Sequence, residues 1–491
     1  MERSAGILMP IFSLPSNYGI GSLGKEAYKF VDFLVEAKQS YWQILPIGPT
    51  SYGDSPYQTF SSYAGNPYFI DLDLLVQDKL LDKIDLKEAI DRNDYIDYGR
   101  LYETRFKILF KAYQNGIEIY KEDFSEFINN NPFIREYALF MALKEKFGMK
   151  SWIEWPDEDI RKRKEEALNK YKELLKERIE FYEFLQFLFF KQFSKLKEYM
   201  NIKGIKLIGD IPIYIPLDSC DCWMNPECFD LDEDYMPLKV AGVPPDYFSE
   251  DGQLWGNPIY NYDYMKSNGY KWWIDRIGFS SKIYDVIRID HFRGFESFWA
   301  VPYGDKTAKN GKWVKGPGMD LLNVFKNWFS GVSFIAEDLG YHSDSVQKML
   351  DDFGFPGMKV LEFGFDSREP SNHAPHAYIK NCVCYVGTHD NSTIMGWLSA
   401  ADKDDVKQAF KYLGLSDTKD FNYHMIRAGM MSVADLFVAQ IQDYLGLDDR
   451  ARINTPGTLG TNWKWRMNFN MLSDDLALKI KDLTKMYERC D

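Results

Sequence analysis

The segment VIRIDHFRG, residues 286–294, joins a run of β-branched side chains to a carboxylate and a glycine. Val286, Ile287 and Ile289 are typical of a short buried strand, and Asp290 comes directly after them. A single aspartate in this position most often forms a turn or caps a helix. The segment decides the fold because the chain repeats its pattern of a short strand that ends in polar residues.

Eight segments of the chain share this pattern, and helical periodicity follows most of them. Strands that alternate with helices form a parallel sheet, and eight such units favour a closed (β/α)8 TIM barrel over an open sheet. The predicted fold class is therefore α/β, with a single catalytic barrel domain over residues 1–491. The predicted strands cover residues 6–11, 41–45, 206–208, 286–289, 334–336, 358–361, 384–387 and 436–441.

The uneven spacing of these strands predicts two large insertions at the catalytic face of the barrel. The first, about residues 73–200, contains a long stretch without glycine or proline and is expected to form a helical subdomain. The second, about residues 217–272, is rich in Pro, Asp, Gly and aromatic residues and shows no strong periodicity. It is expected to form a lid of loops that carries Tyr247, Phe248 and Trp255.

The charge balance limits the partners of the chain. Its 59 Lys and Arg residues stand against 73 Asp and Glu residues, a net charge of −14, so neither nucleic acid nor a membrane is expected as a partner. The N-terminus has no signal-peptide pattern, and the most apolar stretch, residues 181–190, is expected to be a buried helix. Six cysteines without a secretion signal favour free thiols and a cytoplasmic protein. The sequence leaves the oligomeric state open.

Residues 19–24, GIGSLG, match the spacing of a dinucleotide-binding loop. Such a loop needs its first glycine directly after a strand and an acidic residue at the end of the next strand. Here residues 13–18 intervene, and the next strand ends in LPIG, residues 45–48, without a carboxylate. The glycines are therefore expected to shape a loop at the barrel mouth and to lead into a helix near Lys25. No cofactor is expected, and no metal either, because the cysteines and histidines lack zinc-ligand spacing.

Three carboxylates come just after predicted strands: Asp290, Glu337 in AEDLG and Asp390 in THDN. In a barrel the carboxyl ends of all strands face the same mouth, so these side chains are expected to converge. Aromatic residues also lie in loops rich in glycine, proline and asparagine, where they suit a ligand with apolar C–H faces and a hydroxylated rim, such as a sugar. These are Tyr52, Tyr57, Trp255, Trp463 and Trp465.

Converging carboxylates suit chemistry at an acetal carbon. A retaining mechanism uses one ionised carboxylate as nucleophile and one protonated carboxyl group as acid and then base, about 5 Å apart. Arg288 lies two residues before Asp290 on the same side of its strand and is expected to hold that carboxylate ionised and oriented. Glu337 has no cation beside it in sequence, so a less polar or more acidic setting is expected to raise its pKa.

The motifs GDIPIYI, RIDHFRG, AEDLG and THDN resemble, in order and spacing, the four sequence regions of the α-amylase superfamily. A second set looks like the more restricted 4-α-glucanotransferase family of amylomaltases and disproportionating enzymes. The matches run from Ser13 to Arg466 and so cover nearly the whole chain. The second set comprises SLPSNYGIGSLG, SPYQTFSSYAGNP, GQLWGNPIYN, TAKNGKWVKGPG, QDYLGL and RINTPGTLGTNWKWR.

The resemblance implies transfer of α-1,4-glucan segments from a malto-oligosaccharide or starch-type donor to the 4-OH of an acceptor glucan or glucose. It makes Asp290 the nucleophile, Glu337 the general acid and base, and Asp390 the residue that binds ring hydroxyls and stabilises the transition state. The remaining residues that it implies contact the nucleophile or the glucan: Arg288, His389 and Asp210 at the cleavage point, Tyr57 stacked on the sugar ring, Trp255 in a flexible loop over the acceptor, and Asn462 in the cleft.

Two other functions stay open. A hydrolase of the α-amylase type shares the glycosyl-enzyme intermediate and differs only in whether water or a sugar hydroxyl reaches it. A catalytically silent glucan-binding protein would use the aromatic loops while the acids serve as caps and acceptors. Transfer is favoured over hydrolysis by the resemblance, with a lid that excludes water as its physical basis.

Overall fold

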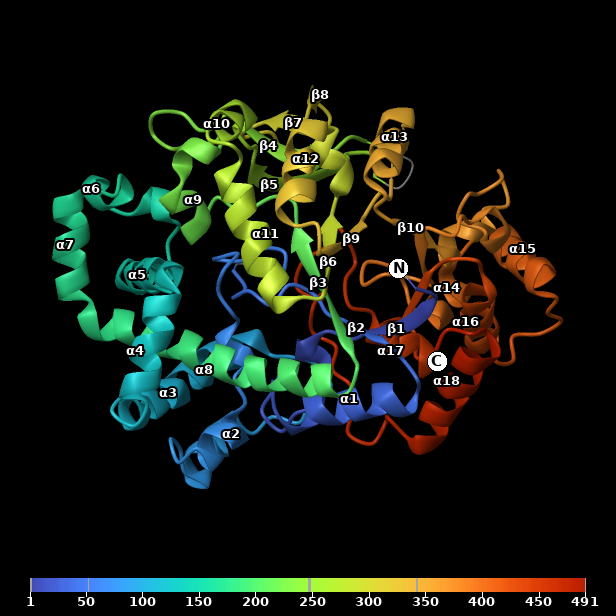
Figure 1. Ribbon diagram of the computed structural model, residues 1–491, viewed down its shortest axis with the longest axis horizontal. Coiled ribbons are helices and arrows are strands. Elements are labelled where there is room, and N and C mark those ends of the chain that lie inside the picture. Colours follow the sequence, from blue (N-terminus) through green and yellow to red (C-terminus); the bar gives the residue numbers. More distant parts are fainter. Residues whose placement is uncertain (1, 52, 246–248, 341–342, 491) are drawn as a thin grey trace.

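The structure is a computed structural model that describes residues 2–51, 53–245, 249–340 and 343–490. The expectations for Tyr52, Tyr247 and Phe248 lie outside these described residues. Figure 1 shows the helices arranged around a central sheet, with the N-terminal strand beside the C-terminal part of the chain.

Eight parallel strands form the central sheet, in the order β10-β11-β12-β1-β2-β3-β6-β9. β1 pairs with both β2 and β12, and Ala336 N donates to Pro356 O over 3.0 Å, which links the two end strands. The α/β barrel expected from the sequence is confirmed, and each predicted strand overlaps an observed one. The strands are β1 (Ser4–Leu8), β2 (Tyr41–Gln43), β3 (Lys206–Pro212), β6 (Val286–Asp290), β9 (Ser333–Ala336), β10 (Gly357–Val360), β11 (Cys382–Tyr385) and β12 (Leu436–Gln440).

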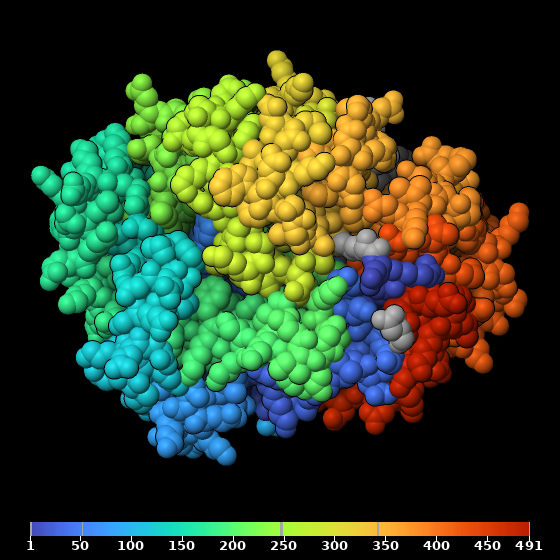
Figure 2. All heavy atoms as spheres, in the orientation of Figure 1, coloured from blue at the N-terminus to red at the C-terminus, as the bar shows by residue number. Residues whose placement is uncertain are grey.

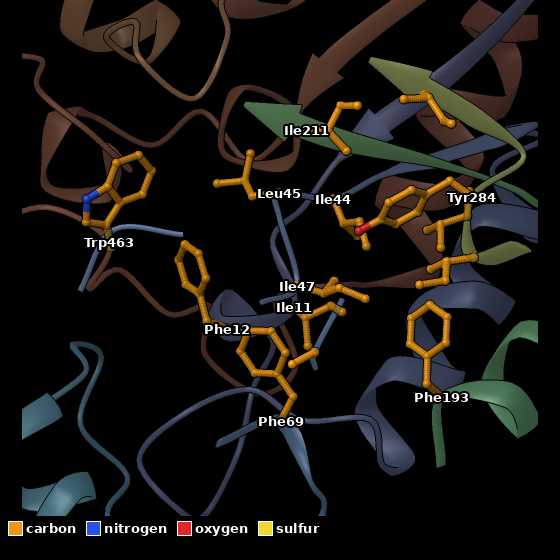
Figure 3. Packing of buried hydrophobic residues seen from close by; sticks show 14 of the residues in the cluster. Ile11, Phe12, Ile44, Leu45, Ile47, Phe69, Phe193, Ile211, Tyr284 and Trp463 are labelled. Atoms are coloured by element: carbon orange, nitrogen blue, oxygen red, sulfur yellow. The ribbon is translucent and has the colours of Figure 1, made fainter. Parts of the chain in front are cut away.

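Two buried clusters hold the barrel together, because alternate side chains of each strand point to opposite faces. The smaller cluster comes almost wholly from the strands and includes Leu8, Ile208, Val286, Val383 and Val438. The larger one joins strands, helices and loops. Figure 3 shows part of it, where residues that follow β1 and β2 pack with side chains from distant segments; among those labelled are Ile11, Phe12, Ile44, Leu45, Ile47, Phe69, Phe193, Ile211, Tyr284 and Trp463.

The chain between β2 and β3 is mainly helical and lies at the left of Figure 1. Its longest helix packs against α3, α4 and α5 through a face rich in phenylalanine and contains the predicted buried stretch 181–190. The helices here are α2 (Leu72–Gln77), α3 (Tyr98–Gly116), α4 (Lys121–Asn130), α5 (Pro132–Lys146), α6 (Glu158–Arg161), α7 (Glu165–Leu174) and α8 (Lys176–Ile202).

A second, antiparallel sheet lies beside the barrel, in the order β5-β4-β7-β8. Residues 217–272 were expected to form a lid of loops; the expectation of loops is wrong, because this segment supplies two of the strands and two helices, and its role as a lid stays a prediction. The sequence does not predict β4 and β5, because both strands are short and contain glycine. The other two strands of their sheet, β7 and β8, come from the chain between β6 and β9. The elements are α9 (Cys220–Met224), β4 (Lys239–Val243), β5 (Gln253–Pro258), α10 (Tyr262–Ser267), β7 (Ser297–Pro302) and β8 (Lys312–Lys315).

The remaining helices surround the barrel, and none in the described parts of the chain is long and apolar enough to cross a membrane. α1 begins at Lys25 with Gly24 as its N-cap, so the glycine-rich segment leads into a helix as predicted. The two ends of the chain meet (Figure 2), where Arg489 Nη1 donates to Ser4 O over 3.0 Å. These helices are α1 (Lys25–Glu36), α11 (Lys271–Ile283), α12 (Met319–Trp328), α13 (Asp344–Phe353), α14 (Ile394–Ala400), α15 (Lys403–Leu413), α16 (Phe421–Met431), α17 (Ile441–Tyr444) and α18 (Asp474–Met486).

Candidate active site

Charged side chains gather at the carboxyl ends of four barrel strands. Asp210 lies near the end of β3, Arg288 and Asp290 end β6, Glu337 follows β9, and Asp390 follows β11 by five residues. The parallel register places Asp210 opposite Arg288 on neighbouring strands, so both side chains belong to the same layer of the barrel. The electrostatic influence of Asp210 and Asp390 on Asp290, and of Asp290 on Glu337, agrees with this convergence.

Arg288 is the cation of this cluster and is 3% exposed. Its Nη1 lies 2.7 and 2.6 Å from the two carboxylate oxygens of Asp210 and 2.9 Å from Asp290 Oδ1. The expected contact with Asp290 is therefore present, but Arg288 has a closer partner in Asp210. A buried guanidinium shared between two carboxylates offsets only part of the cost of burying both charges.

Burial raises the pKa of Asp290 to about 6, against the lowering influence of Arg288, with further raising by Asp210 and Asp390. Arg288 thus favours the ionised form of Asp290, as expected, but burial has the larger influence on this pKa. Desolvation by the surrounding barrel loops outweighs the cation, and the sequence neighbours of Asp290 do not reveal it. At neutral pH the carboxylate is still mostly ionised, as a nucleophile must be.

Glu337 is 8% exposed and its side chain is fixed by two backbone amides. His291 N donates to Oε2 and Leu339 N donates to Oε1, both over 2.7 Å. Burial, and after it the charge of Asp290, raises the pKa of Glu337 to about 8 against the lowering influence of Arg288 and the two amides. Glu337 is thus a buried carboxyl group that keeps its proton at neutral pH, as expected for a less polar and more acidic setting.

Tyr57 and His389 join the carboxylates into one network. The Tyr57 hydroxyl donates to Asp210 Oδ2 over 2.8 Å, and its ring stacks on the imidazole of His389 at a centroid distance of 5.1 Å. His389 Nδ1 lies 3.4 Å from the same hydroxyl, and its Nε2 lies 3.2 Å from Asp390 Oδ1. These contacts link the loop after β2 to Asp210 near the end of β3 and to residues that follow β11.

Trp255 lies differently from the expectation, whereas the place of Asn462 in a glucan cleft stays a prediction. Trp255 belongs to strand β5 rather than to a loop, and its ring meets the edge of the His291 ring at 4.8 Å and 89°. Asn462 binds within its own loop: its Oδ1 accepts from Thr455 N over 3.0 Å, and its Nδ2 donates to Thr458 O over 2.9 Å. No hydrogen bond between Asn462 and the three carboxylates occurs among the described residues.

Sequence reasoning missed three further residues of the site. His291 follows Asp290, has a φ of 52°, and its backbone amide donates a hydrogen bond to Glu337. The only sequence signal for this role is the position of His291 in the HFRG motif. Arg452 and Asn454 contact Asp390 from a loop more than 60 residues downstream, and nothing local in RINTPG indicates it. Among the described residues, no group of three or more His, Cys, Asp or Glu side chains is arranged to hold a metal ion.

A parallel eight-stranded barrel that gathers carboxylates, an arginine and a histidine at the carboxyl ends of its strands defines an enzyme of the (β/α)8-barrel class. The family model for glycoside hydrolase family 77, described as 4-alpha-glucanotransferase, matches residues 9–472, and the chain belongs to this family. The resemblance and the enzyme class expected from the sequence are thereby confirmed.

Individual relatives match over the whole chain. The 4-alpha-glucanotransferase of Clostridium butyricum is 50% identical over 488 residues, which cover 98% of this chain and 100% of that protein. The 4-alpha-glucanotransferase of Thermus thermophilus is 41% identical over 501 residues, covering 100% of this chain and 99% of that protein. The solved structure of an amylomaltase from Streptococcus agalactiae in complex with acarbose has a TM-score of 0.97 at 42% identity and covers 100% of both chains.

Proposed function

We propose that this enzyme transfers α-1,4-glucan segments from a malto-oligosaccharide or starch-type donor to the 4-OH of an acceptor glucan or glucose. The single observation that carries the proposal is the pairing of an ionised Asp290 with a protonated Glu337 at the mouth of a barrel of this family. A retaining double displacement requires this division of labour, with the two carboxyl groups about 5 Å apart.

In the first step, an Asp290 carboxylate oxygen forms a bond to the anomeric carbon of the donor. The bond from that carbon to the leaving glycosidic oxygen breaks, and Glu337 gives its proton to that oxygen. The Arg288 contact on Asp290 Oδ1 leaves the other oxygen for attack. The leaving glucan thus departs with a new 4-OH, and Glu337 is left ionised beside an uncharged glycosyl ester.

In the second step, Glu337 takes the proton of an acceptor 4-OH, and the acceptor oxygen bonds to the anomeric carbon as the ester bond to Asp290 breaks. Both residues return to their starting charge. Loss of the Asp290 charge during the first step makes deprotonation of Glu337 easier, because that charge raises its pKa in the free enzyme. The same coupling therefore supports acid catalysis first and base catalysis second.

The other residues act on the sugar ring and its charge. Asp390 and His389 are placed to bind ring hydroxyls, and the Asp390 charge stabilises the positive character that develops at the anomeric carbon. Asp210 holds Arg288 and Tyr57 in place, and Tyr57 offers a ring on which the sugar can stack. Asn462 shapes the loop 455–462, a candidate wall of the glucan cleft.

Transfer rather than hydrolysis requires that a glucan reach the intermediate before water does. The antiparallel sheet brings Trp255 against His291, next to the amide that holds Glu337, where an apolar ring favours an acceptor sugar over water. The partners that we propose for this enzyme are malto-oligosaccharides and other α-1,4-glucans. The net charge of −14 favours neither nucleic acid nor lipid, and the composition favours a cytoplasmic location.

Incubation of the enzyme with maltotriose, followed by product analysis, tests the proposal. A ladder of shorter and longer glucans supports transfer, whereas shortening alone supports a hydrolase and no change supports a binding protein. Asp290→Asn and Glu337→Gln should lose the ladder, by at least about 10³-fold for the acid and base. A binding protein would keep its affinity for maltotriose in both variants and show no turnover in any form.

A further inference from the structure

The contacts that Asp390 makes with the protein fall on one of its two carboxylate oxygens. Its side chain is 43% exposed, compared with 29% for Asp290. Oδ1 accepts a hydrogen bond from Asn454 Nδ2 over 2.6 Å and lies 3.2 Å from His389 Nε2. Within the described parts of the chain, no residue donates a hydrogen bond to Oδ2. An ionised carboxylate accepts on both oxygens, so Oδ2 is left for a ligand.

Arg452 holds the backbone on either side of this contact. Its Nη2 donates to Asp390 O over 2.7 Å, its Nη1 to Ser392 Oγ over 3.1 Å and its Nε to Asn454 O over 2.8 Å. Asn454 N in turn donates to His389 O over 3.1 Å. Arg452 and Asn454, which we call the 452–454 clamp, therefore fix both the main chain and the side chain of Asp390.

The 452–454 clamp restricts the conformation of the Asp390 side chain. Asp390 lies on the loop between β11 and α14, where a half-exposed aspartate is free to change rotamer. A donor on Oδ1 selects one rotamer, and an amide does so without adding a positive charge that would offset the carboxylate. Both oxygens of Asp390 are thus used: one for orientation by the protein and one for the sugar.

We propose that Asn454 and Arg452 are positioning residues that aim Asp390 Oδ2 at the ring hydroxyls of the sugar bound between Asp290 and Glu337. This inference rests on the proposed function, because it assigns to Asp390 the binding of those hydroxyls in the transition state. The 452–454 clamp lies in the segment after β12, the eighth strand of the barrel. It therefore orients a carboxylate, Asp390, that follows the neighbouring seventh strand, β11.

The replacement Asn454→Asp keeps the shape of the side chain but replaces its donor by a carboxylate. In maltotriose disproportionation, kcat is expected to fall about 10- to 100-fold with KM changed little, since the aim of Oδ2 matters most in the transition state. The loss should depend on pH. At low pH a proton shared between the two carboxylates restores a hydrogen bond to Asp390, whereas at high pH two charges repel and turn Oδ2 away.

The measurement is the ratio of variant to wild-type kcat from about pH 5.5 to about pH 8.5. The titratable and charged groups near Asp390 are His389, Tyr57, Arg452 and Asp290; all four are present in both proteins, so their effects largely cancel in the ratio. A ratio that falls as the pH rises supports positioning through Asp390. A kcat within twofold of wild type, or a loss that is equal at every pH, overturns it.

Two further variants show whether the loss comes from the position of Asp390 or merely from a new charge in the loop. Asn468→Asp makes the same replacement at an exposed position of the same connection between α17 and α18, outside the loop 455–462, and should leave kcat within about twofold of wild type. Arg452→Lys keeps the charge but loses the three-way contact, so kcat should fall without the pH-dependent ratio of Asn454→Asp. Wild-type enzyme that makes no glucan ladder would instead contradict the proposed function itself.

Discussion

The backbone amide of His291 donates a hydrogen bond to Glu337 Oε2 over 2.7 Å, so the residue that follows Asp290 in sequence holds the second carboxylate of the site. His291 has a φ of 52°, in the left-handed region that side-chain-bearing residues rarely adopt. Backbone in this region persists where the surrounding structure compensates for its cost. Here Phe292 N also donates to Glu337 O over 2.9 Å, so the end of β6 and the end of β9 are fixed to each other.

The pH dependence of kcat/KM should be bell-shaped. Asp290 must be ionised to attack, so activity rises as the pH increases through its pKa of about 6. Glu337 must be protonated to act as acid, so activity falls as the pH increases through its pKa of about 8. Initial rates on maltotriose at low substrate concentration, from pH 4 to 10, measure the two limbs, which belong to the coupled pair. A flat profile between pH 5 and 9 would contradict this assignment.

Tyr57→Phe should have a moderate effect. The variant keeps the ring that stacks on His389 but loses the hydrogen bond to Asp210, which still has Arg288 as a partner. One hydrogen bond to a charged group is worth about 1.5–3 kcal/mol, so kcat/KM should fall roughly 10- to 100-fold, and further in Tyr57→Ala. Tyr264→Phe removes the hydroxyl of an exposed tyrosine that contacts Glu227 and none of the three site carboxylates; it serves as the control and should match wild type. Equal activity of Tyr57→Phe and Tyr264→Phe would remove Tyr57 from the network.

Trp255→Ala should shift the balance from transfer towards hydrolysis. The ring contacts His291 beside Glu337, and its removal leaves space for water at that place. The ratio of new reducing ends to transfer products, measured on maltotriose, should rise several-fold, while Trp255→Phe lies between. Trp328→Ala removes an exposed ring from α12 and should leave the ratio unchanged. An unchanged ratio in Trp255→Ala would show that other residues exclude water.

The variant Asp443→Asn tests whether the buried side chain of Asp443 is protonated in the folded protein. Burial raises the pKa of Asp443 to about 7, with a further contribution from Asp449. Between about pH 4 and pH 7 the folded state keeps the proton that the unfolded state loses, so stability falls by about 1.4 kcal/mol for each pH unit and levels off above pH 7. The amide variant still accepts from Ile394 N and has no such loss.

The expected readout is therefore a difference in the free energy of unfolding between variant and wild type. In urea titrations this difference should grow in favour of Asp443→Asn from pH 4 to 7 and then stay constant. Asp402→Asn is the matched control, because Asp402 caps an exposed helix end and lies outside the barrel interior. A difference that is constant from pH 4 to 7 would mean that Asp443 is ionised throughout.

The fold followed from local patterns. Each strand of the barrel carries its own apolar run and ends at a polar or glycine-rich loop, so VIRID and its counterparts were found without any knowledge of contacts. The antiparallel sheet is not predicted, because β4 and β5 are short and because β4, the partner of β5, also pairs with β7, more than 50 residues further along the chain. Non-local pairing leaves no periodic signal in the sequence.

The positions of Asp290, Glu337 and Asp390 at strand ends were likewise predictable, since the barrel topology alone sends them to one mouth. The causes of the raised pKa values of Asp290 and Glu337 were only half predictable. The absence of a cation beside Glu337 indicated a raised pKa, but the neighbour of Asp290 suggested a lowered one, and burial reversed it. Asn454 could not be found at all, because its contact with Asp390 depends on a loop 64 residues away.

The sequence by itself determined the barrel, the family and which acids meet at its mouth, because hydrophobic periodicity and motif order are properties of the chain. Only the tertiary structure decided that burial is the main cause of the raised pKa of both Asp290 and Glu337, which oxygen of Asp390 is left free and which strand carries Trp255. These depend on desolvation and on hydrogen bonds between segments far apart along the chain, and such contacts exist only once the barrel has closed.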